Sequence, residues 1–255
     1  MGNIISWSGG KDSTATIILA HELGILIDAV VIALLYFDKE RGICAADPDH
    51  IEWLIEFAVP KIRSWGYNVK IYEAKHDYMY WFNKIIEHSE LEGINGKKKG
   101  FLIGGRCRLT SEKQSTIKRI DIELKGYTNI VGICADEPER IERMVKRGQR
   151  SLLSENGFTQ EDARRICEEY GLLSPTYRKN RRDGCWFCPN ASIKHYARLK
   201  TERPDLYGEL EKMSKDKNLV SYGFKYGKTF QEVDEMVEEY LKKPKQMDLF
   251  GNIEF

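Results

Sequence analysis

Residues 3–14 read NIISWSGGKDST, and they are the most informative part of the chain about its fold. Its first positions suit a buried strand, two glycines allow a tight turn, and Ala15–Leu23 continues with helix-like spacing. A strand that turns through glycines into a helix gathers consecutive backbone N–H groups and the positive end of the helix dipole in one concavity. The stretch therefore predicts an α/β fold whose first turn can hold a phosphate group.

The side chains of this turn are also suited to phosphate. Serine and threonine hydroxyls add hydrogen-bond donors, Lys11 adds a cation, and Asp12 could position a magnesium ion beside the phosphates. A Walker A loop is excluded, because it would need a glycine at Ile5 and a hydroxyl residue at Asp12. A glycine-rich turn without function is the competing interpretation.

The turn resembles the PP-loop, Ser-x-Gly-x-Asp-Ser, of the ATP pyrophosphatases, and every fixed position of that motif is matched. The resemblance implies that ATP is cleaved between its α- and β-phosphates and that a substrate oxygen is adenylylated. It also implies catalytic roles for Lys11, Asp12 and Ser13. The residues expected to bind ATP with Mg²⁺ are Ser8, Gly9, Gly10, Lys11, Asp12, Ser13 and Thr14.

Charge and hydropathy narrow the class of protein. Lys plus Arg number 40 and Asp plus Glu number 39 among 255 residues, so no global field draws the chain to nucleic acid or anionic lipid. The longest apolar run, Ile25–Phe37, is interrupted by Asp28 and is too short to span a bilayer. Residues 1–6 match the letters of a myristoylation site but are expected to form the first strand. We therefore expect a cytoplasmic protein that makes no membrane contact and whose six cysteines are reduced.

Strand-like and helix-like segments alternate through residue 135, which predicts a parallel sheet with helices on both faces, in the manner of a Rossmann fold. Strands are expected at 3–8, 29–35, 68–73 and 129–133, helices at 12–23, 48–65, 76–89 and 111–124, and an exposed loop at 91–100.

The character of the sequence changes after Arg150. No further strand is evident, 159–169 opens with a Thr-x-x-Asp capping box, 175–190 is irregular and basic, and 193–214 has helical spacing. The predicted organisation is a nucleotide-binding domain at 1–150, a helical cysteine-bearing region at 151–240 and a flexible tail at 241–255.

Cysteines suggest a metal centre. Residues 184–189 read GCWFCP, and two thiolates at this spacing can bind one metal or one cluster iron. A thioredoxin-like redox pair is disfavoured because the motif follows a basic, irregular segment. Cys167 is expected in the core of a helix. The predicted metal ligands are Cys107, Cys185 and Cys188, with Cys44 and Cys134 as candidates for a fourth.

From Ser8 to about residue 190 the chain is similar to the phosphoadenosine phosphosulfate (PAPS) reductase-like branch of the PP-loop enzymes. The similarity is carried by the PP-loop, by the Arg-Cys segment with its downstream lysine, by residues 132–140 and by the GCWFCP motif. It implies substrate or phosphate contacts from Arg106, Lys113, Glu137 and Arg140.

Three departures disfavour sulfonucleotide reduction. No adjacent Cys-Cys pair is present, no cysteine follows Cys188 to attack sulfate, and Cys134 replaces the arginine at the end of a strand. A cluster with three protein ligands leaves one iron open for a sulfide. In this respect the chain resembles the PP-loop sulfurtransferases that thiolate tRNA and the ATP pyrophosphatases of DNA phosphorothioation. An iron–sulfur cluster and a structural Zn²⁺ remain alternatives.

Two segments suggest nucleic acid. Residues 177–182 read YRKNRR, which suits a phosphate backbone, although a solvated loop fits equally well. Gln246–Phe250 resembles the peptide by which bacterial DNA-handling proteins dock on the sliding clamp. The leading hypothesis is ATP-dependent sulfur insertion into DNA or tRNA, with a sulfur donor protein as a further partner. Alternatives are a sulfonucleotide reductase and a non-catalytic nucleotide-binding partner in a DNA-modification or phage system. The sequence leaves the oligomeric state open.

Overall fold

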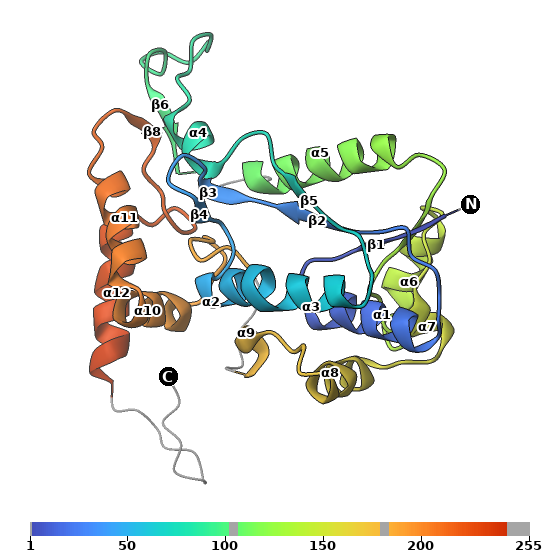
Figure 1. The fold of residues 1–255 in the computed structure, drawn as a ribbon. Coiled ribbons are helices and arrows are strands. Elements are labelled where there is room, and N and C mark those ends of the chain that lie inside the picture. Colours follow the sequence, from blue (N-terminus) through green and yellow to red (C-terminus); the bar gives the residue numbers. More distant parts are fainter. Residues whose placement is uncertain (1, 102–106, 179–183, 244–255) are drawn as a thin grey trace. The chain divides into compact units, whose positions relative to one another are not determined.

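The computed structural model describes residues 2–101, 107–178 and 184–243 (Figure 1). By their contacts, these residues form two compact units, each made of discontinuous segments. Unit 1 is drawn from Met1–Lys75 and Glu112–Gly184, and unit 2 from His76–Ser111 and Cys185–Phe255. The domain limits expected from the sequence, at residues 150 and 240, remain a proposal.

A four-stranded parallel sheet forms the centre of unit 1. Its strands are β1 (Asn3–Ser6), β2 (Ala29–Leu34), β5 (Val69–Glu73) and β7 (Thr128–Ile130). Their order across the sheet is β5-β2-β1-β7, and every neighbouring pair is parallel. The chain moves outward from β1 to β5 and then returns to the other side of β1. The strand order therefore reverses between β1 and β7, and open α/β sheets bind ligands outside the carboxyl ends of strands at such a switch point.

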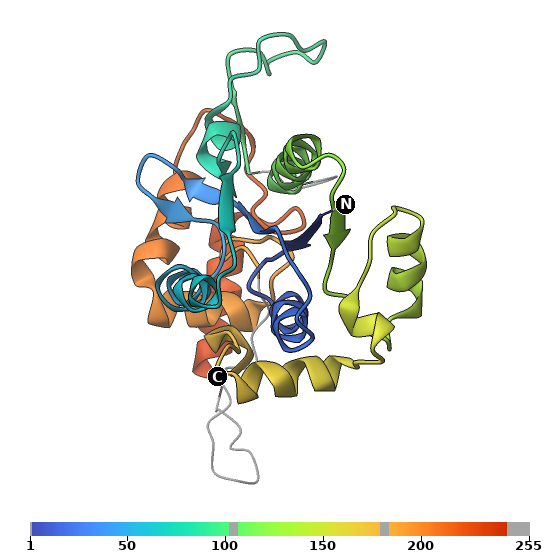
Figure 2. The same ribbon diagram turned by 45° about the vertical axis from the view of Figure 1, so that its right-hand side comes forward.

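Both faces of this sheet are covered by apolar side chains, which confirms the predicted α/β class. Because successive side chains of a strand point to opposite faces, Ile5 and Ile4 enter different clusters. The cluster with Ile5 contains residues of α1 (Lys11–Glu22), α3 (Val59–Ser64) and α8 (Gln160–Glu169). The cluster with Ile4 contains Ile120 and Leu124, which lie in and just after α5 (Arg108–Glu123). Figures 1 and 2 show α5 in green and α1 in blue on opposite sides of the strands.

The helices of unit 1 begin where the sequence supplies caps. Asp47 caps α2 (Pro48–Glu52), and Thr159 with Asp162 forms the predicted capping box of α8. The expected helix at 48–65 is continuous but contains a π turn, Trp53–Ala58, between α2 and α3. Pro60 lacks a backbone N–H, which loosens the hydrogen-bond ladder just before it. The remaining elements of unit 1 are the hairpin β3 (Tyr36–Asp38) and β4 (Ile43–Cys44), and the helices α6 (Pro138–Val145), α7 (Leu152–Glu155) and α9 (Pro175–Arg178).

Unit 2 combines one strand pair with helices. It contains α4 (Tyr78–Asn83), β6 (Lys98–Gly100), β8 (Leu219–Ser221), α10 (Ile193–Glu202), α11 (Pro204–Ser214) and α12 (Phe230–Lys242). Strands β6 and β8 are parallel, with Lys98 opposite Leu219. Buried aromatic rings fill its interior, and Phe82, Phe101 and Phe224 follow one another with ring centroids 5.3 Å apart in each contact.

Three expectations about these segments are wrong. The helix expected at 76–89 ends at Asn83, because Lys84 is extended and Ile85 bridges to Lys98. The loop expected at 91–100 therefore ends in strand β6, and strand β8 follows residue 150, where no strand was expected. Residues 193–214 are helical, as expected, and form two helices, because a proline disfavours helical geometry in the residue before it and Arg203 has φ −136° and ψ 65°.

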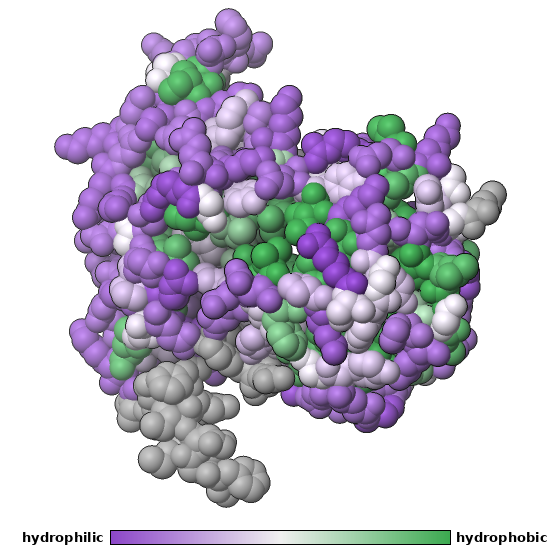
Figure 3. Space-filling model, in the orientation of Figure 1, coloured by the Kyte–Doolittle hydropathy of each residue, from purple (hydrophilic) through white to green (hydrophobic). Residues whose placement is uncertain are grey.

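No helix in the described ranges is long and apolar enough to cross a membrane. Hydrophilic residues cover much of the face drawn in Figure 3. The residues of the expected tail from 244 onward lie outside the described part of the chain.

Candidate functional site

The predicted phosphate turn lies between β1 and α1, at the carboxyl end of the sheet. Gly9 has φ +79°, in the left-handed region that favours glycine. Gly10 is the N-cap of α1 and supplies no side chain to the first N–H groups of the helix. The N-terminus of α1 therefore has the form of an anion site, with the positive end of its dipole at the turn.

Hydroxyl groups hold this turn in shape. The Ser13 hydroxyl donates to the Gly10 carbonyl at 3.0 Å and accepts from the Ser8 N–H at 3.3 Å. The Ser8 and Ser13 hydroxyl oxygens are 3.3 Å apart. Thr14 is buried, and its Oγ1 accepts from the Trp7 indole N–H at 2.9 Å, so it joins the strand to the helix from inside. Its role as an ATP ligand stays a prediction.

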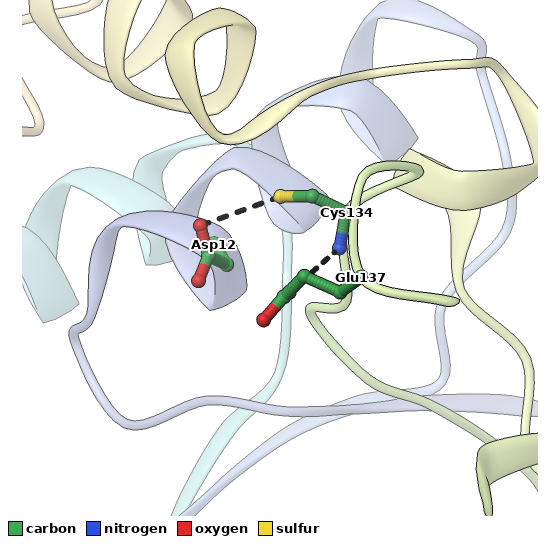
Figure 4. Close-up of side chains that lie close together, drawn as sticks. All are labelled: Asp12, Cys134 and Glu137. Atoms are coloured by element: carbon green, nitrogen blue, oxygen red, sulfur yellow. Dashed lines mark hydrogen bonds between the residues drawn. The ribbon is translucent and has the colours of Figure 1, made fainter. Parts of the chain in front are cut away.

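Acidic and thiol groups converge beside the turn (Figure 4). The Cys134 thiol donates to Asp12 Oδ1 across 3.5 Å, and the Cys134 backbone N–H donates to Glu137 Oε2 at 3.2 Å. In the described ranges, this is the one group of three His, Cys, Asp or Glu residues whose ligand atoms all lie within 4.8 Å of one another. Asp12 is also paired with Lys11, and Glu137 with Arg140. The two carboxylates could hold a hard divalent cation.

Cys134 stays protonated under ordinary conditions. Burial, followed by the nearby charge of Asp12, raises the pKa of its thiol to about 12. Because a thiol must lose its proton to bind a metal, the carboxylates are better ligands here than the sulfur.

Gly132, two residues after β7, allows the chain to approach the backbone at the start of α1 closely. A Cβ atom at Gly132 would lie 2.5 Å from both the Asp12 carbonyl carbon and the Ser13 nitrogen. The segment after β7 therefore contacts the backbone at the start of α1, and only a residue without a side chain allows this approach. The same contact brings Cys134 and Glu137 beside Asp12.

His50 lies beneath the turn and was missed by the sequence analysis. It is 3% exposed, and its Nε2 lies 3.1 Å from the Ser8 carbonyl oxygen. Since a carbonyl only accepts, Nε2 donates to it, and Nδ1 lies 2.8 Å from the Ser174 hydroxyl oxygen. Ser174 in turn lies 2.9 Å from the Thr176 hydroxyl. The signal that the sequence offered for His50 was a histidine within the helical spacing of residues 48–65.

Other predicted contacts have different placements. Arg106 lies outside the described residues. Lys113 is exposed on α5. Arg140 forms an ion pair with Glu137, which lies in the group with Asp12 and Cys134. Their contacts to substrate stay predictions.

The C-x-x-C motif forms a turn in unit 2, to which Cys107 also belongs. The Cys188 N–H donates to the Cys185 carbonyl at 3.1 Å. The turn is fixed by its neighbours: the Trp186 carbonyl oxygen lies 2.8 Å from His195 Nε2, and Lys225 donates to the Pro189 and Ala191 carbonyls at 2.9 and 2.6 Å.

The predicted ligand set is only partly gathered. Cys107, Cys185 and Cys188 are half-buried, but they are not a group with all sulfur atoms within 4.8 Å in the described chain. Cys44 and Cys134, the candidates for a fourth ligand, belong to unit 1. Cys167 is fully buried on α8, as expected, and its thiol donates to the Lys11 carbonyl at 3.3 Å.

Comparisons with known proteins give fold-level neighbours only. No family model and no curated protein matches the chain. Among solved structures, it is similar to the U34-tRNA thiolase NcsA from Methanococcus maripaludis with its 4Fe-4S cluster, at 16% identity and a TM-score of 0.41, over 98% of this chain and 74% of that one. It is also similar to the NH3-dependent NAD synthetase from Campylobacter jejuni in complex with nitrate, at 12% identity and a TM-score of 0.37, over 97% and 90%. The functional assignment therefore depends on the chain's own residues.

Proposed function

We propose that this chain is an ATP-dependent enzyme of the PP-loop type, which cleaves ATP to AMP and pyrophosphate and adenylylates a substrate oxygen. The observation that carries the proposal is the glycine turn at the N-terminus of α1, with carboxylates gathered beside it at the switch point of the sheet. A PP-loop motif in an unrelated position would lack this context.

In the proposed reaction, a substrate oxygen attacks the α-phosphorus, and the bond from that phosphorus to the bridging oxygen breaks. The departing pyrophosphate carries the negative charge. The N–H groups at the start of α1 stabilise this charge, since the helix begins at the turn, and Lys11, which is paired with Asp12, adds a cation. Asp12 and Glu137 would hold Mg²⁺, which when bound neutralises phosphate charge.

The finer proposal is sulfur insertion into a nucleic acid, DNA or tRNA. AMP is a good leaving group, so a sulfur nucleophile can attack the acceptor atom that bears the adenylylated oxygen; the bond to sulfur forms, the bond from that atom to the oxygen breaks, and the oxygen departs as part of AMP. Cys107, Cys185 and Cys188 would hold an iron–sulfur cluster, with Zn²⁺ as the alternative, and a donor protein would supply the sulfur. Support comes from their common unit and from the fixed C-x-x-C turn.

Product analysis with ATP labelled on the α-phosphate tests the activity, with cellular RNA or DNA as acceptor. We expect AMP, pyrophosphate and label on the acceptor. Asp12→Asn should reduce AMP formation at least tenfold without unfolding the chain, while Asp121→Asn, an exposed change on α5, should not. ADP as the main product would falsify the proposal, and nucleotide binding without pyrophosphate release would favour a non-catalytic partner.

The clamp contact remains a separate proposal, because Gln246–Phe250 lies outside the described residues. Two apolar side chains in a pocket contribute ~1.5–3 kcal/mol each, less the cost of ordering the peptide, so binding should be on the order of micromolar. A bacterial sliding clamp should bind the intact protein, and binding should be lost in the double variant Leu249→Ala, Phe250→Ala. Equal binding by both proteins excludes the peptide.

A further inference from the structure

A group of aromatic and cationic side chains gathers on α4, β6 and the start of α5, all within unit 2. We call this group the Trp81 patch. Its members are His76, Tyr80, Trp81, Lys84, Lys99 and Arg108.

The rings of the patch support one another. His76 and Tyr80 are stacked, with centroids 3.9 Å apart and planes 12° from parallel. Trp81 meets Tyr80 edge-on at 5.2 Å. Tyr80 is 43% exposed, so an aromatic ring is held at the surface by its neighbours rather than buried in the core. A supported, exposed ring of this kind can stack on a planar ligand.

Three cations surround Trp81. Lys84, Lys99 and Arg108 lie 5.0, 5.2 and 5.5 Å from the centroid of its ring. Burial and then the positive charges of Arg108 and Lys84 lower the pKa of Lys99. Among the described residues, no carboxylate forms an ion pair with any of the three. By contrast, Lys98, the residue before Lys99 on the same strand, forms an ion pair with Asp216, with its Nζ 2.7 Å from Asp216 Oδ2.

Like charges held together without an acidic partner repel one another, so an anion would be bound favourably there. The chemistry of the anion follows from the rings. An acidic peptide or a lipid headgroup would satisfy the cations but would leave the exposed Tyr80 ring unused. Phosphates joined to planar bases use both, and bases are available for stacking only where a strand is unpaired.

We propose that the Trp81 patch binds a single-stranded segment of nucleic acid, with phosphates at Lys84, Lys99 and Arg108 and a base on Tyr80. The choice of nucleic acid rests on the proposed function, which takes DNA or tRNA as acceptor. Binding itself involves no ATP, and the patch lies apart in the sequence from the basic segment at 177–182.

Fluorescence anisotropy with the full-length protein tests the proposal. The probes are a labelled RNA strand, the DNA strand of the same sequence, and the DNA duplex, each measured over a range of salt without ATP. We expect both single strands to bind more tightly than the duplex, and the difference between RNA and DNA identifies the source. Poly-glutamate serves as a competitor, and it should displace the strands poorly.

Two variants separate charge from stacking. The triple variant Lys84→Ala, Lys99→Ala, Arg108→Ala should weaken binding at least tenfold and reduce the slope of log K against log salt by about 2, since each phosphate contact on a single strand contributes roughly 0.7. Tyr80→Ala should weaken binding on the order of tenfold and leave the slope unchanged. Because Tyr80 also stacks on His76, thermal unfolding and the retained salt slope show that the patch stays folded in this variant.

The matched control removes three exposed lysines outside the patch, Lys61→Ala, Lys125→Ala and Lys194→Ala. It should change binding by less than twofold. The proposal is overturned if the control and patch triple variants weaken binding equally, or if both bind as tightly as the wild type. It is also overturned if poly-glutamate competes as well as an unlabelled nucleic-acid strand does. ATP cleavage to AMP in a protein that binds no strand would refute the patch and leave the proposed activity intact. Binding of a strand by a protein that releases no pyrophosphate would support the patch and refute the proposed ATP cleavage.

Discussion

Substituting Gly132 by alanine tests whether the contact between the end of β7 and the phosphate turn sets the geometry of the site. The new Cβ would lie 2.5 Å from the Asp12 carbonyl carbon and the Ser13 nitrogen, where an ordinary contact begins at 3.4 Å. The two backbone segments must therefore separate by 3.4 − 2.5, or about 0.9 Å. Both neighbours are backbone atoms, so no side chain can turn aside to make room.

This displacement has consequences for stability and for activity. Overpacking of this kind typically costs about 1–3 kcal/mol in the free energy of unfolding. A shift of about 1 Å in a catalytic group can lower a rate on the order of a hundredfold. We therefore expect Gly132→Ala to lose more activity than stability, because Asp12 and Ser13 lie at the displaced point. Denaturant unfolding and AMP formation measure the two effects.

Gly208→Ala is the matched control for this prediction. Gly208 lies within α11, and a Cβ there would meet nothing within 4 Å. The same substitution should stabilise the helix by roughly 0.5–1 kcal/mol and leave AMP formation unchanged. If Gly132→Ala matched Gly208→Ala in both measurements, the close approach of β7 would have no role in the site.

Three further predictions concern buried groups and the metal centre. His50→Ala should cost about 1–3 kcal/mol of stability and raise the KM for ATP, because the imidazole contacts to the Ser8 carbonyl and the Ser174 hydroxyl are lost. His50→Gln, whose amide can donate to that carbonyl, should recover part of the affinity, and equal KM values for the two variants would contradict this. Burial raises the pKa of the Cys167 thiol from 9.0 to about 12, so its contribution to stability is complete below about pH 9 and is lost as pH rises toward 12. Between these pH values, the free energy of unfolding should fall less steeply in Cys167→Ala than in the wild type, by up to ~1.4 kcal/mol per pH unit. An unchanged slope would refute the reasoning. Cys107→Ser should lower the metal content of anaerobically purified protein, whereas Cys167→Ser should leave it unchanged. Full metal occupancy in the Cys107 variant would exclude Cys107 as a ligand. A broad blue-violet absorption band of the wild-type protein would distinguish an iron–sulfur cluster from zinc.

Sequence patterns correctly predicted those elements whose geometry depends on residues close by in the sequence. The strand, glycine turn and helix of residues 3–22 follow from apolar spacing and from glycines that permit a positive φ. The start of α8 follows from the hydrogen bonds between Thr159 and Asp162, which are only three residues apart. The burial of Cys167 follows from its place in the helical period.

Contacts distant in sequence decided the rest. The strand at 98–100 depends on pairing with residues 219–221, more than a hundred positions away. Ile85 in turn bridges to Lys98, and this contact overrides the helical spacing of 76–89 beyond the end of α4. The hydrogen bonds of His50 to Ser8 and Ser174 likewise link three separate segments.

Local spacing and turn chemistry were enough to predict the glycine turn between the first strand and the first helix, and the parallel sheet that follows. The positions of Cys134 and Glu137 beside Asp12, and of three cations around Trp81, became visible only in the folded chain. The physical reason is that strand order and close backbone approaches, such as that of Gly132 to α1, result from the packing of the whole chain and leave no periodic pattern in the sequence.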